Sequence, residues 1–182
     1  MGNPACGDHG HGRGPLMQAQ FDGTMNDFEQ KIVQNVDRHG CHINWIFDPD
    51  EPAPSFAYSI GFTKTLGVPE VILFGLPQDT CGPAINALLK MCAAGMPLAE
   101  GEVIPEFFGA YDCAIRLVHE SWLTEEYFAS ALWYHRTQMG QPLRHVAMIV
   151  WPDKSHRFPW DDGCADWVRV DQPALYNPKV LS

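Results

Sequence analysis

The chain has 182 residues, of which 46% are hydrophobic, and its ten Phe, six Trp and five Tyr are enough to build one buried core. Its 12 basic and 22 acidic residues give a formal net charge of -10, which disfavours nucleic acids and anionic membranes as partners because like charges repel. No stretch approaches the roughly 18 consecutive apolar residues of a membrane span, and no signal peptide is visible, so we expect a cytoplasmic protein.

The chain divides into two parts. Residues 1–24 are rich in Gly and His and show no apolar periodicity, so we interpret them as a disordered tail or a mis-assigned start, with Met25 as a second plausible start. Residues 25–182 are predicted to form a single globular domain. The six cysteines include no Cys-x-x-Cys pair, and we expect reduced, mostly buried thiols.

The first half predicts one helix and three strands. Asn26 and Glu29 have the spacing of a capping box, and Gly40 stands where a helix ends, so a helix is expected between them. Strands are predicted over residues 41–47 and 55–62, and residues 63–69 are expected to be a connection. The run 70–75 is apolar without alternation, which predicts the innermost strand of the sheet.

The second half predicts two helices alternating with two strands. Asp79 or Thr80 caps a helix that ends at Gly95, because apolar residues recur from Cys81 at offsets of four, seven, eight and eleven. A strand over residues 111–119, a helix over 124–136 and a strand over 145–151 follow, and the rest is expected to be an irregular tail packed by Trp167, Leu175 and Tyr176.

This element order predicts an α+β fold. Three early strands with short connections, followed by helix, strand, helix and strand, favour a single layer of mainly antiparallel or mixed sheet packed by about three helices.

Six separate motifs occur in an order typical of one family. They are Gly40-Cys-His42, Pro54-Ser-Phe-Ala-Tyr-Ser-Ile-Gly-Phe-Thr63, Gly67-Val-Pro-Glu70, Phe74-Gly-Leu-Pro77, Val150-Trp-Pro-Asp153 and Arg157-Phe-Pro-Trp-Asp161. Together they resemble the bacterial family known as domain of unknown function 4262, from about Phe28 to Pro173. Met148 departs from the family pattern, where Gln is expected. The resemblance implies no catalytic residue, so every role below comes from residue chemistry.

Two groups of polar and aromatic residues could form a ligand site if the strands that carry them are neighbours. A cleft lined by Trp and Tyr with a few convergent polar groups suits a small polar molecule or a peptide. The alternative is that these side chains are turn anchors and aromatic plugs of the architecture. The candidates are His42, Tyr58, Thr63 and Glu70 from the early strands, with Trp151, Asp153, Arg157, Trp160 and Asp161 from the last strand and its loop.

Three functions remain open on this basis. The first is a binding module that holds a small polar molecule or a peptide in this aromatic, His- and Asp-lined cleft. The second is an enzyme in which His42, with Tyr58 or Asp153, performs acid-base chemistry. The third is a protein-interaction module with an exposed apolar patch. A strand period of two places His42 opposite Cys41, so these two cannot form a nucleophile pair, and a structural histidine is the alternative.

No metal site is indicated, and the cofactor is left open. His39 and His42 straddle the end of a predicted helix and have no second pair at a zinc-like spacing, and Cys6, Asp8, His9 and His11 lie in the expected tail. Glycine-rich phosphate-binding loops and a Gly-x-Ser-x-Gly elbow are absent from the sequence. The oligomeric state is left open.

Overall fold

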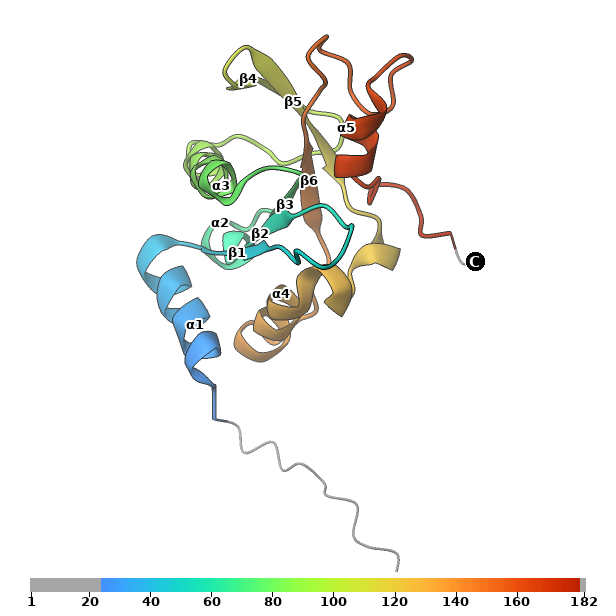
Figure 1. Ribbon diagram of the computed structural model, residues 1–182. Helices are drawn as coiled ribbons and strands as arrows, with labels where there is room; N and C mark the ends of the chain where they lie inside the picture. The colour runs from blue at the N-terminus through green and yellow to red at the C-terminus, as the bar shows by residue number, and fades with distance from the viewer. Residues whose placement is uncertain (1–23, 181–182) are drawn as a thin grey trace, which may run out of the picture.

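The computed structural model describes residues 24–180, and these form a six-stranded sheet between two layers of helices (Figure 1). The strand order is β1-β2-β3-β6-β5-β4. The pair β3 and β6 is parallel and the other neighbours are antiparallel, so the predicted α+β fold with a mixed sheet is confirmed. The residues interpreted as a tail, 1–24, lie outside the described part except for Thr24.

The first helix and the first two strands form as the pattern predicts. Helix α1 (Asp27–His39) begins with a capping box between Asn26 and Glu29 and ends at Gly40, whose φ of 83° is the left-handed conformation that glycine adopts most readily. Strand β1 (His42–Ile46) pairs with β2 (Phe56–Ile60), and His42 lies opposite Ile60.

A short helix replaces the connection expected over residues 63–69. Helix α2 (Phe62–Leu66) starts directly after Gly61, and strand β3 (Glu70–Phe74) follows it. All five residues of β3 are buried, and β3 lies between β2 and β6, as predicted for an inner strand. The apolar run needs no alternation because helices cover both faces.

The second half adds a strand and a helix that the sequence pattern did not predict. The expected elements are α3 (Gln78–Ala93), β5 (Tyr111–Leu117), α4 (Glu125–Gln138) and β6 (Val146–Val150). The additional ones are the edge strand β4 (Val103–Phe108), a 3-10 turn at Glu120–Trp122, and α5 (Asp166–Asp171) in the segment expected to be irregular. The longer helices α1, α3 and α4 match the expected three.

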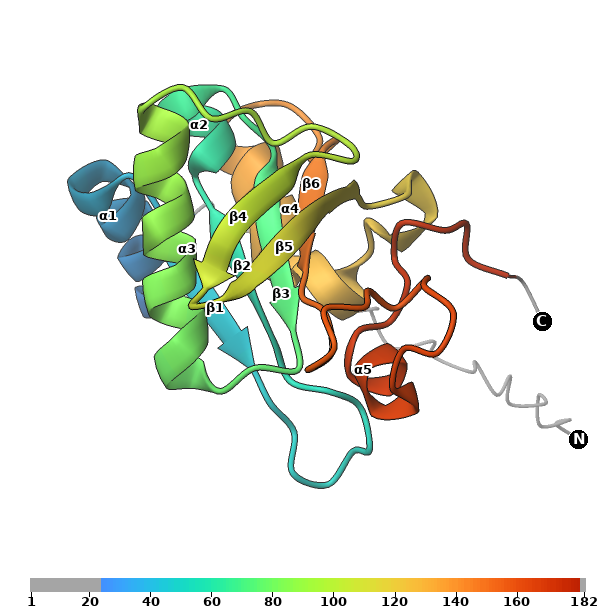
Figure 2. The same cartoon turned by 90° about the horizontal axis from the view of Figure 1, so that it is seen from above.

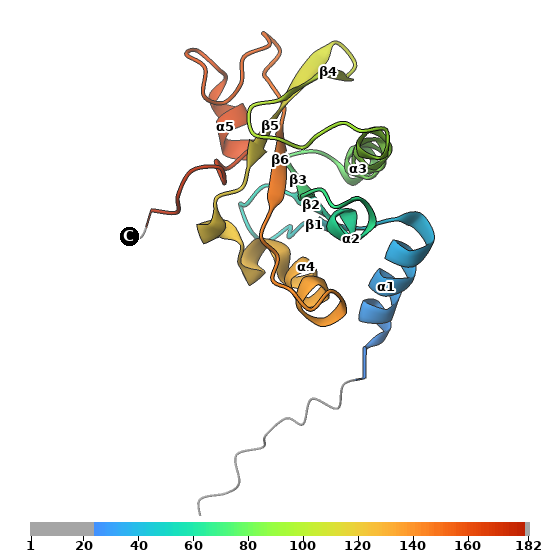
Figure 3. The ribbon, with the colours of Figure 1, turned by 180° about the vertical axis from the view of Figure 1, so that it is seen from behind.

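Side chains from the two sheet faces build two halves of the core. Helix α3 covers one face through Cys81, Ile85 and Leu88, and α1 and α4 cover the other, as Figures 1 and 3 show from opposite sides. The five cysteines in the described residues are free and buried, and burial raises the pKa of the Cys113 thiol to about 12. No helix in the described part combines the length and the apolar character needed to cross a membrane.

The positions of α2 and α5 define the two ends of the sheet (Figure 2). Glu70, which follows α2, begins β3 opposite Val146 at the start of β6. Trp151 follows the last residue of β6, so it lies about 16 Å from Val146 at the rise of a strand. The Glu70 end and the Trp151 end of the sheet are therefore separate places.

Candidate functional site

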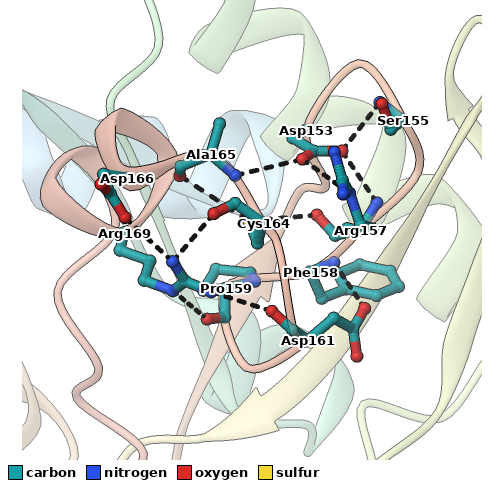
Figure 4. A network of polar contacts seen from close by, with 10 residues as sticks. All are labelled: Asp153, Ser155, Arg157, Phe158, Pro159, Asp161, Cys164, Ala165, Asp166 and Arg169. Carbon is teal, nitrogen blue, oxygen red and sulfur yellow. Dashed lines mark hydrogen bonds and ion pairs between the residues drawn. The ribbon is translucent and has the colours of Figure 1, made fainter.

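Asp153 organises the loop that follows β6 (Figure 4). Its Oδ1 accepts hydrogen bonds from the amides of Ser155 at 2.7 Å and Arg157 at 3.0 Å. Its Oδ2 accepts from the Arg157 Nε at 3.2 Å and from the Ala165 amide at 3.1 Å. A single carboxylate thus joins both ends of a hairpin-like loop. Asp153 itself is 3% exposed.

These contacts change the acidity of Asp153. Burial acts to raise the pKa of the carboxyl group, but the hydrogen bonds from the amides of Arg157, Ala165 and Ser155, with the Arg157 charge, lower the pKa below its ordinary value. Asp153 is therefore an ionised residue that holds the loop. Its oxygens are occupied by protein donors.

Arg169 from α5 fixes the second part of the loop (Figure 4). It donates to the carbonyl oxygens of Pro159, Cys164 and Asp161 at 2.7 to 2.8 Å. The Asp161 carboxylate accepts from the Phe158 amide at 2.7 Å. Charged side chains hold both ends of the loop through hydrogen bonds to other groups of the protein. These contacts make the loop a scaffold for the residues around it.

This scaffold places aromatic rings around an open cleft of about 240 Å³, here called the aromatic cleft. Trp151 forms its floor, because its ring is buried and its Nε1 donates to the Phe74 carbonyl at 2.9 Å. The ring of Trp167 lies 5.6 Å from that of Trp151 and is 51% exposed. The lining residues are Leu76, Phe108, Tyr111, Trp151, Pro152, Asp153, Lys154 and Trp167.

Lys154 is the cation of this cleft. It is exposed at the rim, and its ammonium group makes no ion pair or hydrogen bond among residues 24–180. Because the Asp153 oxygens are already used, Lys154 is the charged group in the lining that is free to meet a ligand.

The structure distributes the other predicted residues over separate places. Arg157 supports the loop, and Trp160 stacks on Phe158 with ring centroids 5.0 Å apart. Trp160 lines a different cavity, of about 400 Å³, where the Arg116 guanidinium lies 4.9 Å from its ring centre. Of the residues predicted from the last strand and its loop, Trp151 and Asp153 line the aromatic cleft.

Thr63 and Glu70 lie at the other end of the sheet. Glu70 is fully buried and its carboxylate accepts from the Ser59 hydroxyl at 2.6 Å. It also accepts from the amides of Gly61, Phe62 and Thr63 at 3.0 to 3.2 Å, which are the free donors at the start of α2. His135 Nε2 lies 3.2 Å from Glu70 Oε1.

His42 and Tyr58 belong to a third cluster. Asn35 Nδ2 lies 2.8 Å from His42 Nδ1, His42 Nε2 lies 2.9 Å from Asn44 Oδ1, and Asn44 Nδ2 donates to the Tyr58 hydroxyl at 2.9 Å. Burial lowers the pKa of His42, outweighing the opposite effect of its hydrogen bond to Asn44. A neutral imidazole fits this series of hydrogen bonds, because side-chain amides contact both of its ring nitrogens.

Sequence reasoning missed several residues of these sites. His135 lies within the helix predicted over residues 124–136, but its pairing with Glu70 joins positions 65 residues apart, which no local pattern reveals. Trp167 was expected to pack the tail, and no sequence pattern pointed to Lys154. Within the described residues, no group of three or more His, Cys, Asp or Glu side chains is placed to hold a metal ion; Cys6, Asp8, His9 and His11 lie outside them.

Comparison with curated proteins found no match, and comparison with solved structures found none either. The sequence does match a family described as a domain of unknown function (DUF4262), over residues 35–165. This match spans the sheet from α1 to the Asp153 loop and covers well over half of the chain. The protein therefore belongs to the DUF4262 family.

Proposed function

We propose that this domain binds a small polar molecule that carries a flat ring and a negatively charged group, and that the aromatic cleft is its site. The observation that carries the proposal is the scaffold around Asp153, which holds the Trp151 and Trp167 rings beside an unpaired Lys154. Rings supply apolar contact and a few placed polar groups orient the ligand, which is the usual composition of small-molecule sites.

The size of the cleft limits the ligand. At about 240 Å³ it lies just below the common range of roughly 300 to 1,000 Å³ for ligand sites. One ring system with a short polar substituent fits this volume.

The charge of the cleft favours an anion. Asp153 directs its oxygens to amides of its own loop, while Lys154 has no carboxylate partner among the described residues. A carboxylate on the ligand would form an ion pair with Lys154 while the ring stacks on Trp167.

The acid-base alternative finds less support in the geometry. Both ring nitrogens of His42 face protein amides, Tyr58 is 2% exposed, and Asp153 follows the far end of the sheet. For an interaction module, Phe28 and Phe47 are exposed apolar residues, but nothing in the described structure indicates what would cover them.

The test is a binding measurement with benzoate and indole-3-carboxylate, each compared with its neutral amide, by chemical-shift titration of the tryptophan indole N–H signals. We expect the acids to bind more tightly than the amides and to shift the signals of Trp151 and Trp167. Trp167→Ala should weaken binding of the acids about tenfold, the upper end of one aromatic contact. Lys154→Gln should remove the difference between acid and amide.

The matched control is Trp160→Ala, because Trp160 is a partly exposed tryptophan of the same segment that lines another cavity. It should leave the affinities unchanged. Equal effects of Trp167→Ala and Trp160→Ala would contradict the proposal. Binding of a Trp-containing peptide with the same residue dependence, but of none of the small acids, would assign the cleft to peptides instead.

A further inference from the structure

A second cavity, of about 280 Å³, lies at the α2 end of the sheet and is here called the histidine cavity. No acidic residue of the described range 24–180 lines it, although the whole chain has 22 acidic against 12 basic residues. Arg144 and His145 line it, are exposed, and make no side-chain hydrogen bond or ion pair within residues 24–180. The full lining is Thr63, Gly67, Val68, Pro69, His135, Gln141, Pro142, Arg144 and His145.

The wall of this cavity includes His135, which is 2% exposed. The protonation of its ring follows from its partner. Glu70 accepts from the Ser59 hydroxyl and from three backbone amides, and an ionised carboxylate can only accept. The Nε2 atom that faces Glu70 at 3.2 Å must therefore carry the hydrogen.

The other ring nitrogen has no partner in the part of the chain that the structure describes. His135 Nδ1 is buried and makes no hydrogen bond with any described residue. When Nε2 carries the one hydrogen of the ring, Nδ1 is a lone-pair acceptor, and a buried acceptor without a donor is destabilising. Such a group in a built polar cluster indicates a missing partner.

We propose that the histidine cavity binds a small hydroxy acid. Its carboxylate meets Arg144 and His145 at the rim, and its hydroxyl group donates to His135 Nδ1, directly or through one bridging water. Glu70 is a positioning residue that fixes the ring and its hydrogen, as carboxylates do for histidines in other polar sites.

This site is independent of the aromatic cleft. Glu70 starts β3, whereas Trp151 follows the end of β6, so the residues that line the two cavities lie at opposite ends of the parallel strand pair. Figure 2 shows α2 and α5 at these two ends of the sheet. They share no lining residue. Failure of one proposal leaves the other standing.

The experiment uses malate and succinate as probes, because they differ only in the hydroxyl group. Calorimetric titration of the full chain should show malate binding about fivefold more tightly than succinate, the effect of one hydrogen bond. His135→Lys keeps an N–H donor for Glu70 and has no acceptor atom, so it should abolish this preference. Arg144→Gln should weaken both acids about tenfold.

Arg136→Gln is the matched control for Arg144→Gln. It removes the same charge from an exposed residue that does not line the histidine cavity, and should leave both affinities unchanged. Nitrogen chemical shifts of the His135 ring give a readout that needs no ligand, and should show hydrogen on Nε2. Equal binding of malate and succinate, equal effects of the two arginine variants, or a hydrogen on Nδ1, with or without one on Nε2, would overturn the proposal.

Discussion

Two glycines that flank α2 differ in what a side chain would meet. Gly61 has φ of 113°, and an added Cβ would lie 2.8 and 2.9 Å from the methyl groups of Val36. Gly67 has φ of 70°, and nothing lies within 4 Å of the same atom. Backbone strain is common to both, but only Gly61 lets α1 approach the start of α2 closely.

We therefore predict that Gly61→Ala lowers the free energy of unfolding by about 3 kcal/mol, since strain and overpacking add. Gly67→Ala should cost about 1 kcal/mol, from strain alone. Urea denaturation monitored by tryptophan fluorescence measures both. Equal losses of unfolding free energy in the two variants would show that contact with Val36 adds nothing to the cost of a side chain at Gly61.

At the same scale, the sequence identified Glu70 as a candidate for a ligand site but did not reveal its role at the start of α2. Its five contacts come from β2, from the start of α2 and from α4. The strand period shows which face of the sheet a residue occupies. It does not show which backbone amides will donate to that residue, because this depends on where the neighbouring helix starts. The partner His135 became visible only when α4 was placed on the sheet.

The loop from Trp151 to α5 is the element on which the aromatic cleft depends. It contains little regular structure, and Asp153, Arg157 and Arg169 supply the hydrogen bonds that a helix or strand would provide through its backbone. Since the folded state lowers the pKa of Asp153, the carboxylate stabilises the fold above its unfolded pKa of about 3.8, and this contribution is lost as pH falls through the folded value.

Asp153→Asn should accordingly lower the urea midpoint at pH 7, and the difference from the wild type should narrow as pH falls below about 3.8. Asp162→Asn is the matched control, because Asp162 is exposed in the same loop and has no hydrogen bond or ion pair among the described residues. Its midpoint should follow the wild type at every pH. A constant deficit for Asp153→Asn would refute the assigned role of the charge.

The elements that the sequence missed are short or lie at an edge. Strand β4 contains Pro105, which lacks an amide donor, and such a strand is tolerated at the sheet edge where β4 lies. Helices α2 and α5 span five and six residues, too few for apolar periodicity to show. Tertiary contacts, such as Glu70 at the start of α2, stabilise them.

Across the whole molecule, we expect the protection of backbone amides against hydrogen exchange to decrease from the centre of the sheet to its edges. Strands β3 and β6 are buried at every residue, whereas in β4 five of the six residues are not buried and three of these are exposed. Local opening is cheap where few buried contacts must break.

Hydrogen exchange of backbone amides tests this order. Amides of β3 and β6 should exchange only through global unfolding, and those of β4 at least roughly a hundredfold faster. Low concentrations of urea should accelerate exchange in β3 and β6 but hardly in β4. Uniform rates over the six strands would mean that the sheet opens as one unit.

The sequence by itself determined the family, the α+β class, the capped first helix and the inner strand β3, because these depend on local composition, spacing and hydrophobic period. Tertiary structure alone decided which of the candidate residues lie together. The parallel pairing of β3 with β6 sends Glu70 and Trp151 to opposite ends of the sheet and separates candidates that the sequence grouped together. It also brings His135 to Glu70 and Trp167 to Trp151, since such pairings depend on how distant elements pack.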